Sequence, residues 1–289
     1  MVPHRINLKN YAKRIGLSGD FRPDFETLTA IQNAHTCNIP FENLDVVRDL
    51  PIDIEPKQLE DKMINQRRGG YCFEQNGLLL EVLTQIGFDA KPMEARVRIG
   101  NPRDYLPPPT HLFEMVELEA ISWLVDAGVG GMSLTSPIKF KLDVVQQTLH
   151  EPRWISFEDG VYFHQILVGQ EWEDVYEFSG HQMPMIDREV SNWWVSTCAK
   201  AKFKQNMFLA LGRPNGERYG FLNGVFTHRK GAETLREITV TSDEELLHVL
   251  ATEFDLVFPA GTDLGNTGCP WKISGKTKIV CATFKVMTM

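Results

Sequence analysis

Long apolar runs are missing from this chain of 289 residues. The segment from Met1 to Asn7 has no apolar stretch of the kind that a secretory signal peptide needs. No later segment approaches the roughly 20 apolar residues of a transmembrane helix. We therefore expect neither an export signal nor a membrane partner.

Cysteine and basic charge are also scarce. The five cysteines are odd in number and widely spread, with no Cys-x-x-Cys pair, which argues against a disulfide framework and against a structural zinc site. The 30 Lys and Arg against 38 Asp and Glu give a net charge of −8, so nucleic acid is an unfavourable partner. We expect a cytoplasmic protein that binds no metal and acts on a small molecule, with its oligomeric state open.

What the chain does contain is a glycine turn that delivers a cysteine to the start of a helix. The turn is Arg67-Arg68-Gly69-Gly70-Tyr71-Cys72, and apolar residues then recur with a helical period as far as Ile86, before a capping position at Gly87. The first turn of a helix stabilises an anion, and the thiolate is the reactive form of cysteine. A buried, inert cysteine is the alternative. The residues that accompany Cys72 in the site decide whether it is reactive or structural.

The hydrophobic period divides the chain into three regions. Residues 1–88 have a helical period, residues 89–188 alternate as antiparallel strands of a barrel or sandwich do, and residues 189–289 mix both. In the third region we expect a hairpin between Phe208 to Leu211 and Tyr219 to Phe226. The end of the chain, from Gly265, could be a strand or a docked tail. The overall class is α+β.

A cysteine nucleophile needs a base and a group that orients the base. His111 is the best placed of the eight histidines, because it begins a strand after a proline-rich loop. Asp126 ends the next strand, before a glycine-rich loop. A two-residue turn at Glu119-Ala120 would place Asp126 opposite Phe113, diagonal to His111. The two side chains are therefore candidates for one site, although a lone histidine is more often structural.

The glycine-rich loop and one aromatic residue are candidate substrate contacts. The glycines within residues 128–131, followed by Ser133 and Thr135, could let backbone N–H groups approach a phosphate. They could also simply form turns. Phe41, between a proline and charged or amide residues, is either a core anchor or a lining residue of the site, and composition favours the core.

Several segments, taken together, resemble the arylamine N-acetyltransferases. They are Arg68 to Asn76, Thr110-His111-Leu112, Val125 to Gly131, Ile39 to Leu44, and Phe226 to Arg229. The resemblance runs from about residue 7 to 260. It implies an N-terminal helical bundle, a central antiparallel β-barrel and a C-terminal α/β lid, with a cysteine-protease-like catalytic core.

The resemblance also implies a function. Cys72, His111 and Asp126 would form a Cys-His-Asp triad, with acetyl-CoA as the donor and an arylamine, arylhydrazine or N-hydroxyarylamine as the acceptor, in xenobiotic metabolism. Arg68 and Glu42 would form an ion pair that braces the cysteine turn. The candidate substrate-binding residues are Phe41, Val129, Gly130, Gly131 and Thr135.

Two segments depart from the family pattern. Val129 stands where the family usually has phenylalanine, which implies a wider acceptor pocket. Residues 197–203 lack the serines that are usual there, so the coenzyme contacts of this segment are open. The alternatives are a cysteine hydrolase or transglutaminase-like acyl transferase, an amide synthase that closes a macrocycle, and a non-catalytic protein that has kept the fold.

Overall fold

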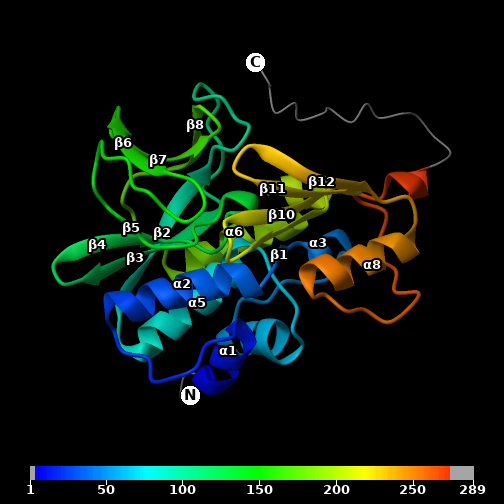
Figure 1. The fold of residues 1–289 in the computed structure, drawn as a ribbon, viewed down its shortest axis with the longest axis horizontal. Helices are drawn as coiled ribbons and strands as arrows, with labels where there is room; N and C mark the ends of the chain where they lie inside the picture. The colour runs from blue at the N-terminus through cyan, green and yellow to red at the C-terminus, as the bar shows by residue number, and fades with distance from the viewer. Residues whose placement is uncertain (1–3, 274–289) are drawn as a thin grey trace.

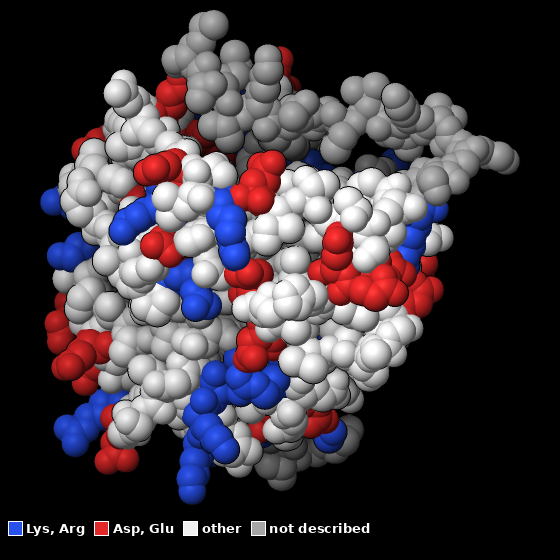
Figure 2. Space-filling view, turned by 45° about the vertical axis from the view of Figure 1, so that its right-hand side comes forward, with Lys and Arg blue, Asp and Glu red and all other residues white. Residues whose placement is uncertain are grey.

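The computed structural model describes residues 4–273, which form helices, a seven-stranded sheet and a five-stranded sheet (Figure 1). The predicted α+β class is confirmed, since helices and antiparallel sheets occupy largely separate segments of the chain. Among the described helices, none has both the length and the apolar character needed to cross a membrane. Acidic and basic side chains both lie on the face drawn in Figure 2.

Helices dominate the chain up to residue 86. They are α1 (Leu8–Ile15), α2 (Phe25–Asn38), α3 (Leu44–Val47), α4 (Pro56–Leu59), the π-helical segment η1 (Glu60–Asn65) and α5 (Cys72–Ile86). Asn7 and Asp24 begin α1 and α2, because each side chain accepts a backbone N–H of the first turn. Gly87 ends α5 in the left-handed conformation, with a φ of 111°. Tyr11, Ile31 and Leu79 belong to the apolar cluster that these helices share.

The seven-stranded antiparallel sheet curls into a nearly closed barrel. Its strands are β2 (Asp89–Val97), β3 (His111–Leu118), β4 (Ile121–Val125), β5 (Ile138–Lys139), β6 (Arg153–Glu158), β7 (Val161–Val168) and β8 (Glu171–Phe178), in the order β5-β4-β3-β2-β8-β7-β6. On β3, Phe113 and Met115 pack into the barrel cluster, whereas Val116 packs with the helices. Strand β3 therefore separates the barrel interior from α5.

The β3-β4 hairpin has the register that the sequence predicts. Glu119 and Ala120 form its two-residue turn with φ values of 53° and 60°, as a type I′ turn requires. The pairing of Glu114 with Val125 places Asp126 one step further along, opposite Phe113. Because His111 stands two residues before Phe113, its side chain lies on the same face of the sheet as that of Phe113. The side chains of His111 and Asp126 therefore share one face.

The five-stranded sheet joins segments that lie far apart in the sequence. Its strands, in order across the sheet, are β1 (Phe41–Glu42), β9 (Phe208–Gly212), β10 (Glu217–Leu222), β11 (Val225–Lys230) and β12 (Glu233–Thr239). The remaining helices are α6 (Met185–Thr197), α7 (Lys202–Gln205), α8 (Asp243–Phe254) and the 3₁₀ turns η2 (Gly130–Met132) and η3 (Pro270–Ile273). Strand β1 thus ties the N-terminal helices to this sheet.

The single strand predicted from Tyr219 to Phe226 is wrong. The chain turns at Asn223-Gly224, where φ is 47° and 89°, so that Leu222 pairs with Val225. Asn-Gly is a preferred sequence for a two-residue hairpin turn, but apolar residues on both sides make the segment look continuous. Of the tail from Gly265, residues 274–289 lie outside the described residues.

Candidate active site

Cys72 is the first residue of α5, in a cluster to which the helices, β3 and the five-stranded sheet all contribute. Two glycines precede it because the backbone passes very close to its neighbours. A Cβ on Gly69 would lie 2.0 Å from the carbonyl oxygen of Pro40, and one on Gly70 would lie 2.6 Å from Glu74 Cβ. Glu74 Oε2 also accepts the backbone N–H of the residue before Cys72, at 3.0 Å, and so caps the helix.

An ion-pair network braces this turn. Arg68 Nη2 lies 2.7 Å from Glu42 Oε1 and 3.0 Å from Asp45 Oδ1. Lys62 Nζ lies 2.7 Å from Asp45 Oδ2 and 2.6 Å from Glu74 Oε1. Because Glu42 and Glu74 are buried, removing either cation would leave an uncompensated charge in the interior. The network holds β1, η1 and the start of α5 in one arrangement.

A chain of neutral hydrogen bonds supports the same turn from the helical side. His35 lies 2.8 Å from the Tyr11 hydroxyl through Nδ1 and 2.8 Å from Gln75 Oε1 through Nε2. Gln75 Nε2 donates to the carbonyl oxygens of Pro40, at 2.7 Å, and Gly70, at 3.2 Å. Burial lowers the pKa of His35 to about 4, so its ring is neutral and serves as a structural link.

His111 and Asp126 form a buried pair next to the start of α5, because Cys72 Sγ contacts the carbonyl oxygen of Thr110, the residue before His111. His111 Nε2 lies 2.9 Å from Asp126 Oδ2, and the two side chains are 1% and 0% exposed. Because an ionised carboxylate can only accept, Nε2 carries the hydrogen. Nδ1 of His111 makes no hydrogen bond within the described part of the chain, which leaves this nitrogen available to take a proton.

Asn76 is a residue of this site to which the sequence analysis assigns no role. It lies one helical turn after Cys72, and its Nδ2 donates to Asp126 Oδ1, at 2.8 Å, and also to the carbonyl oxygen of Leu112. Its Oδ1 accepts the backbone N–H of Ala127 at 2.9 Å. A Cβ on Gly128 would lie 2.7 Å from Asn76 Nδ2 and 2.9 Å from Cys72 Cα. Asn76 stands four residues after Cys72 on the same face of one helix, and this spacing is the feature of the sequence that could have indicated its role.

The environment of Cys72 favours the protonated thiol. Its Sγ donates to the carbonyl oxygen of Thr110 at 3.7 Å. Burial raises the pKa of the Cys72 thiol above its usual range, and the backbone N–H of Phe73 opposes this only in part. The position at the helix start is therefore insufficient by itself to produce the thiolate expected from the sequence. An added positive charge on His111 would be needed.

Tyr176 of β8 lies behind His111 on the barrel side. The two ring centroids are 5.1 Å apart, and the Tyr176 ring is 4.7 Å from that of His164. Its hydroxyl is buried and has no hydrogen-bond partner among the described residues. Burial, and then the charge of Asp126, raise the pKa of Tyr176 well above its usual range. No local pattern in the sequence indicates this contact, because β3 and β8 are both neighbours of β2 but not of each other.

Phe41 is buried in the cluster that contains Cys72. A Cβ on Gly130 would lie 3.6 Å from the Phe41 ring, so the aromatic side chain faces the glycine-rich loop. On its other side, its ring centroid is 5.9 Å from that of Phe203. Phe41 therefore belongs to the core and also lies beside the candidate site, so the two interpretations of this residue are compatible.

The other three candidate substrate contacts lie along the same loop. Val129 is buried among residues of the barrel cluster. A Cβ on Gly131 would meet no atom within 4 Å, so open space adjoins this position. Thr135 is buried, and its hydroxyl lies 2.7 Å from His150 Nδ1.

Three arginines hold the loop, one from β6 of the seven-stranded sheet and two from β10 and β11 of the five-stranded sheet. Their guanidinium groups donate to the carbonyl oxygens of residues 131–133, and all three surround Glu151. They are Arg153, Arg218 and Arg229. Burial alone would raise the pKa of Glu151, but Arg218, and then the other two arginines, lower it to about 2. This cluster fixes the loop that follows Asp126.

Within residues 4–273, no group of three or more His, Cys, Asp or Glu side chains is arranged to hold a metal ion. The chemistry that this arrangement can perform is nucleophilic: a thiol at a helix start, an imidazole with one free nitrogen, and a carboxylate that orients the imidazole.

Comparisons with known proteins identify the family of this chain. A family model described as N-acetyltransferase matches residues 24–262. The chain is 37% identical to an arylamine N-acetyltransferase of Mycolicibacterium smegmatis, over 90% of this chain and 94% of the relative. It is 32% identical to an arylamine N-acetyltransferase / N-hydroxyarylamine O-acetyltransferase of Salmonella typhimurium, over 81% of this chain and 83% of the relative.

A solved structure adds a bound molecule to the comparison. The arylamine N-acetyltransferase of Mycobacterium marinum in complex with CoA superposes with a TM-score of 0.82 and 31% identity, covering 86% of this chain and 93% of the other. The chain therefore belongs to the arylamine N-acetyltransferase family, and it is an acyltransferase enzyme.

Proposed function

We propose that the protein transfers acetyl groups from acetyl-CoA to arylamines through an acetyl-cysteine on Cys72. The observation that carries the proposal is the buried pair of His111 and Asp126, 2.9 Å apart, beside a cysteine at the start of α5. The CoA complex of the M. marinum relative supports the choice of donor. The reaction would follow a ping-pong mechanism.

In the first half-reaction, His111 Nδ1 takes the proton of the Cys72 thiol. The imidazolium that forms is stabilised by the carboxylate of Asp126, and the thiolate by the helix start. The thiolate attacks the acetyl carbonyl, and CoA leaves as its thiol after receiving the proton. Because one thioester replaces another, the step is close to isoenergetic, and this suits a cysteine nucleophile.

In the second half-reaction, the amine attacks the acetyl carbon on Cys72. His111 accepts the proton of the amine, and the Cys72 thiolate leaves. We infer that the backbone N–H of Cys72 helps to hold the oxyanion, a contribution worth about 3 kcal/mol in such reactions. The acceptor then departs as an acetamide, and the free enzyme is restored.

The acceptors that we propose are arylamines, arylhydrazines and N-hydroxyarylamines, in xenobiotic metabolism. The S. typhimurium relative is an N-hydroxyarylamine O-acetyltransferase by name, which supports O-acetylation of the last class. Phe41 and Val129 are our candidates for contacts with the acceptor ring, since both are apolar and belong to the clusters that flank the glycine-rich loop. Gly130, Gly131 and Thr135 are our candidates for contacts with the donor.

Steady-state kinetics test the mechanism. Acetyl-CoA and an arylamine are varied together, and parallel double-reciprocal lines are expected, whereas intersecting lines would exclude the ping-pong scheme. Cys72→Ser should lose transfer. Cys269→Ala is the control, because Cys269 is a free cysteine that packs in the cluster of the five-stranded sheet and not with Cys72, and it should keep full activity.

A further inference from the structure

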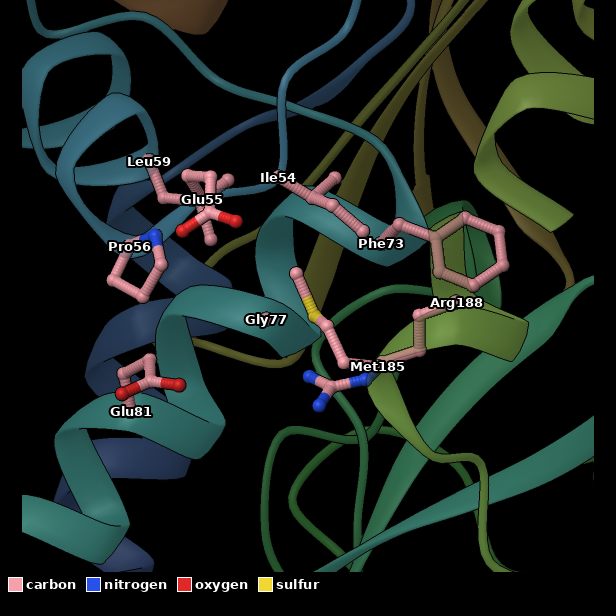
Figure 3. A pocket seen from close by; sticks show the side chains of 9 residues that line it. All are labelled: Ile54, Glu55, Pro56, Leu59, Phe73, Gly77, Glu81, Met185 and Arg188. Carbon is pink, nitrogen blue, oxygen red and sulfur yellow. The ribbon is translucent and has the colours of Figure 1, made fainter. Parts of the chain in front are cut away.

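A cavity lies between α4, α5 and α6, and none of Cys72, His111 and Asp126 lines it. Its volume is about 250 Å³, slightly below the roughly 300–1,000 Å³ of most ligand pockets. It would therefore hold a molecule with a single ring. The lining residues, drawn in Figure 3, are Ile54, Glu55, Pro56, Leu59, Phe73, Gly77, Glu81, Met185 and Arg188.

Most of the wall of this cavity is apolar. Ile54, Leu59 and Phe73 are 8%, 1% and 1% exposed, and Met185 contributes a flexible side chain from the first turn of α6. Gly77 leaves room on the α5 side, because a Cβ there would already lie 3.1 Å from Leu59 Cδ1. An apolar ligand body would remove this surface from water, which is the main driving force for binding in such pockets.

Two charges of opposite sign face the cavity without pairing. Within the described residues, no carboxylate lies within ion-pair distance of the Arg188 guanidinium, although the charge of Glu81 acts on it from further away. The buried Nε of Arg188 has no hydrogen-bond partner in the described structure. Glu81, one turn after Gly77 on α5, lines the cavity and is influenced by the charge of Arg188, but it forms no ion pair at contact distance and no side-chain hydrogen bond in the described structure. Figure 3 shows the Arg188 guanidinium and the Glu81 carboxylate on either side of the space next to Gly77.

The geometry points to a binding site for a small zwitterion, a molecule with one ammonium group, one carboxylate and an apolar body, such as a free amino acid with an apolar side chain. The carboxylate would pair with Arg188 in charge-assisted hydrogen bonds, and the ammonium would pair with Glu81. The apolar body would contact Leu59, Phe73 and Met185. This site is separate from the one that transfers acetyl groups, and its test does not depend on that activity.

Ligands with a single charge fit the cavity less well. An anion would meet Arg188, but it would also meet the carboxylate of Glu81 and, at the exposed edge, that of Glu55. A cation would meet the guanidinium and leave the buried Nε unpartnered. Only a ligand with both charges supplies a partner to both groups, and an unpartnered buried polar group is costly.

Three probes with the same ring test the class of ligand. They are L-phenylalanine, 3-phenylpropanoate, which lacks the ammonium, and 2-phenylethylamine, which lacks the carboxylate. Each is titrated into the full chain without acetyl-CoA, and the dissociation constant is measured by saturation-transfer NMR. We expect saturable binding of L-phenylalanine, with both analogues at least tenfold weaker. Equal binding of either analogue, or no saturable binding of L-phenylalanine, would overturn the proposal.

Variants place the binding in this cavity. Arg188→Gln should raise the dissociation constant of L-phenylalanine at least tenfold, and Glu81→Gln should have the same effect. Glu244→Gln is the control, because Glu244 is exposed on α8 and does not line the cavity. The dissociation constant of L-phenylalanine for this variant should equal that of the wild type. Thermal unfolding of each variant establishes that it is folded. Unchanged affinity in folded Arg188→Gln and Glu81→Gln would show that the amino acid binds elsewhere.

Discussion

The side-chain amide of Asn76 lies 2.8 Å from Asp126 Oδ1, while the other oxygen of the same carboxylate lies 2.9 Å from His111 Nε2. The helix that carries Cys72 thus also carries the residue that orients the carboxylate. Because Asn76 stands one turn after Cys72, a single element sets the positions of the cysteine and, through Asp126, of the imidazole. Asp126 is therefore held between Asn76 and His111.

Asn76→Ala should lower kcat by about tenfold to a hundredfold. A hydrogen bond to a charged group is worth about 1.5–3 kcal/mol, and each 1.36 kcal/mol is tenfold in rate. The rate of arylamine acetylation at saturating substrate checks this. Asn10→Ala, at an exposed position of α1, is the control. Equal kcat in a folded Asn76→Ala enzyme would show that Asp126 needs no such support.

His111→Gln should raise the pH at which Cys72 becomes reactive. In the proposed mechanism, transfer of the thiol proton to His111 offsets the effect of burial on the Cys72 pKa. Without the imidazole, burial dominates and raises that pKa above its usual range. The rate of alkylation by iodoacetamide as a function of pH measures the apparent pKa of Cys72 in the wild type and in His111→Gln. The same inflection in the two proteins would mean that His111 does not share the proton of Cys72.

Glu114→Leu should stabilise the protein by about 1–3 kcal/mol at neutral pH, since a buried polar group without a partner costs that much. Glu114 is fully buried, and neither carboxylate oxygen has a hydrogen-bond partner among the described residues. Burial, and then the charge of Asp126, raise its pKa well above the usual range. The folded state therefore keeps a proton that the unfolded chain loses above about pH 4.3, and stability falls as the pH rises past that value.

Urea denaturation at pH 4 and pH 7 measures this effect. The gain from Glu114→Leu should be larger at pH 7 than at pH 4. Glu117→Leu provides the comparison, because Glu117 is on the same strand but is partly exposed and accepts hydrogen bonds from Ser122. A loss of stability in Glu114→Leu at pH 7 would show that the buried carboxyl has a partner.

Glu151→Gln should destabilise the protein by about 3–5 kcal/mol at neutral pH, the usual effect of removing one member of a buried ion pair. The folded pKa of Glu151 is lowered to about 2 by its three arginines despite burial, against about 4.3 in the unfolded chain. The contribution of the charge is thus complete above about pH 4.3 and is lost as the pH falls toward 2. Urea denaturation at pH 7 and pH 3 should show a smaller difference from wild type at pH 3. An equal difference at both pH values would contradict the ion-pair account.

The sequence predicts those parts of the site that local rules control. The glycine turn before Cys72, the cap at Gly87 and the two-residue turn at Glu119-Ala120 each follow from backbone geometry, and the last of these fixes the register that brings Asp126 to His111. The hairpin turn at Asn223-Gly224 was equally local, but the apolar residues around it conceal it.

The remaining parts depend on contacts between distant segments. Tyr176 reaches His111 only because β8 pairs with β2 in the barrel, and Glu151 meets three arginines from two different sheets. The hydrophobic periodicity of the sequence does not indicate which distant segments come into contact. The raised pKa of Cys72 has the same origin, since it arises mainly from burial by neighbours that are remote in the sequence.

The most direct test of the central claim is the mass of the intact protein after incubation with acetyl-CoA. We predict a gain of one acetyl group, located on Cys72 by peptide mapping, that disappears when an arylamine is added and is absent in Cys72→Ser. An unmodified wild-type protein that still acetylates the amine would contradict the account, because the acetyl group would then pass directly from donor to acceptor.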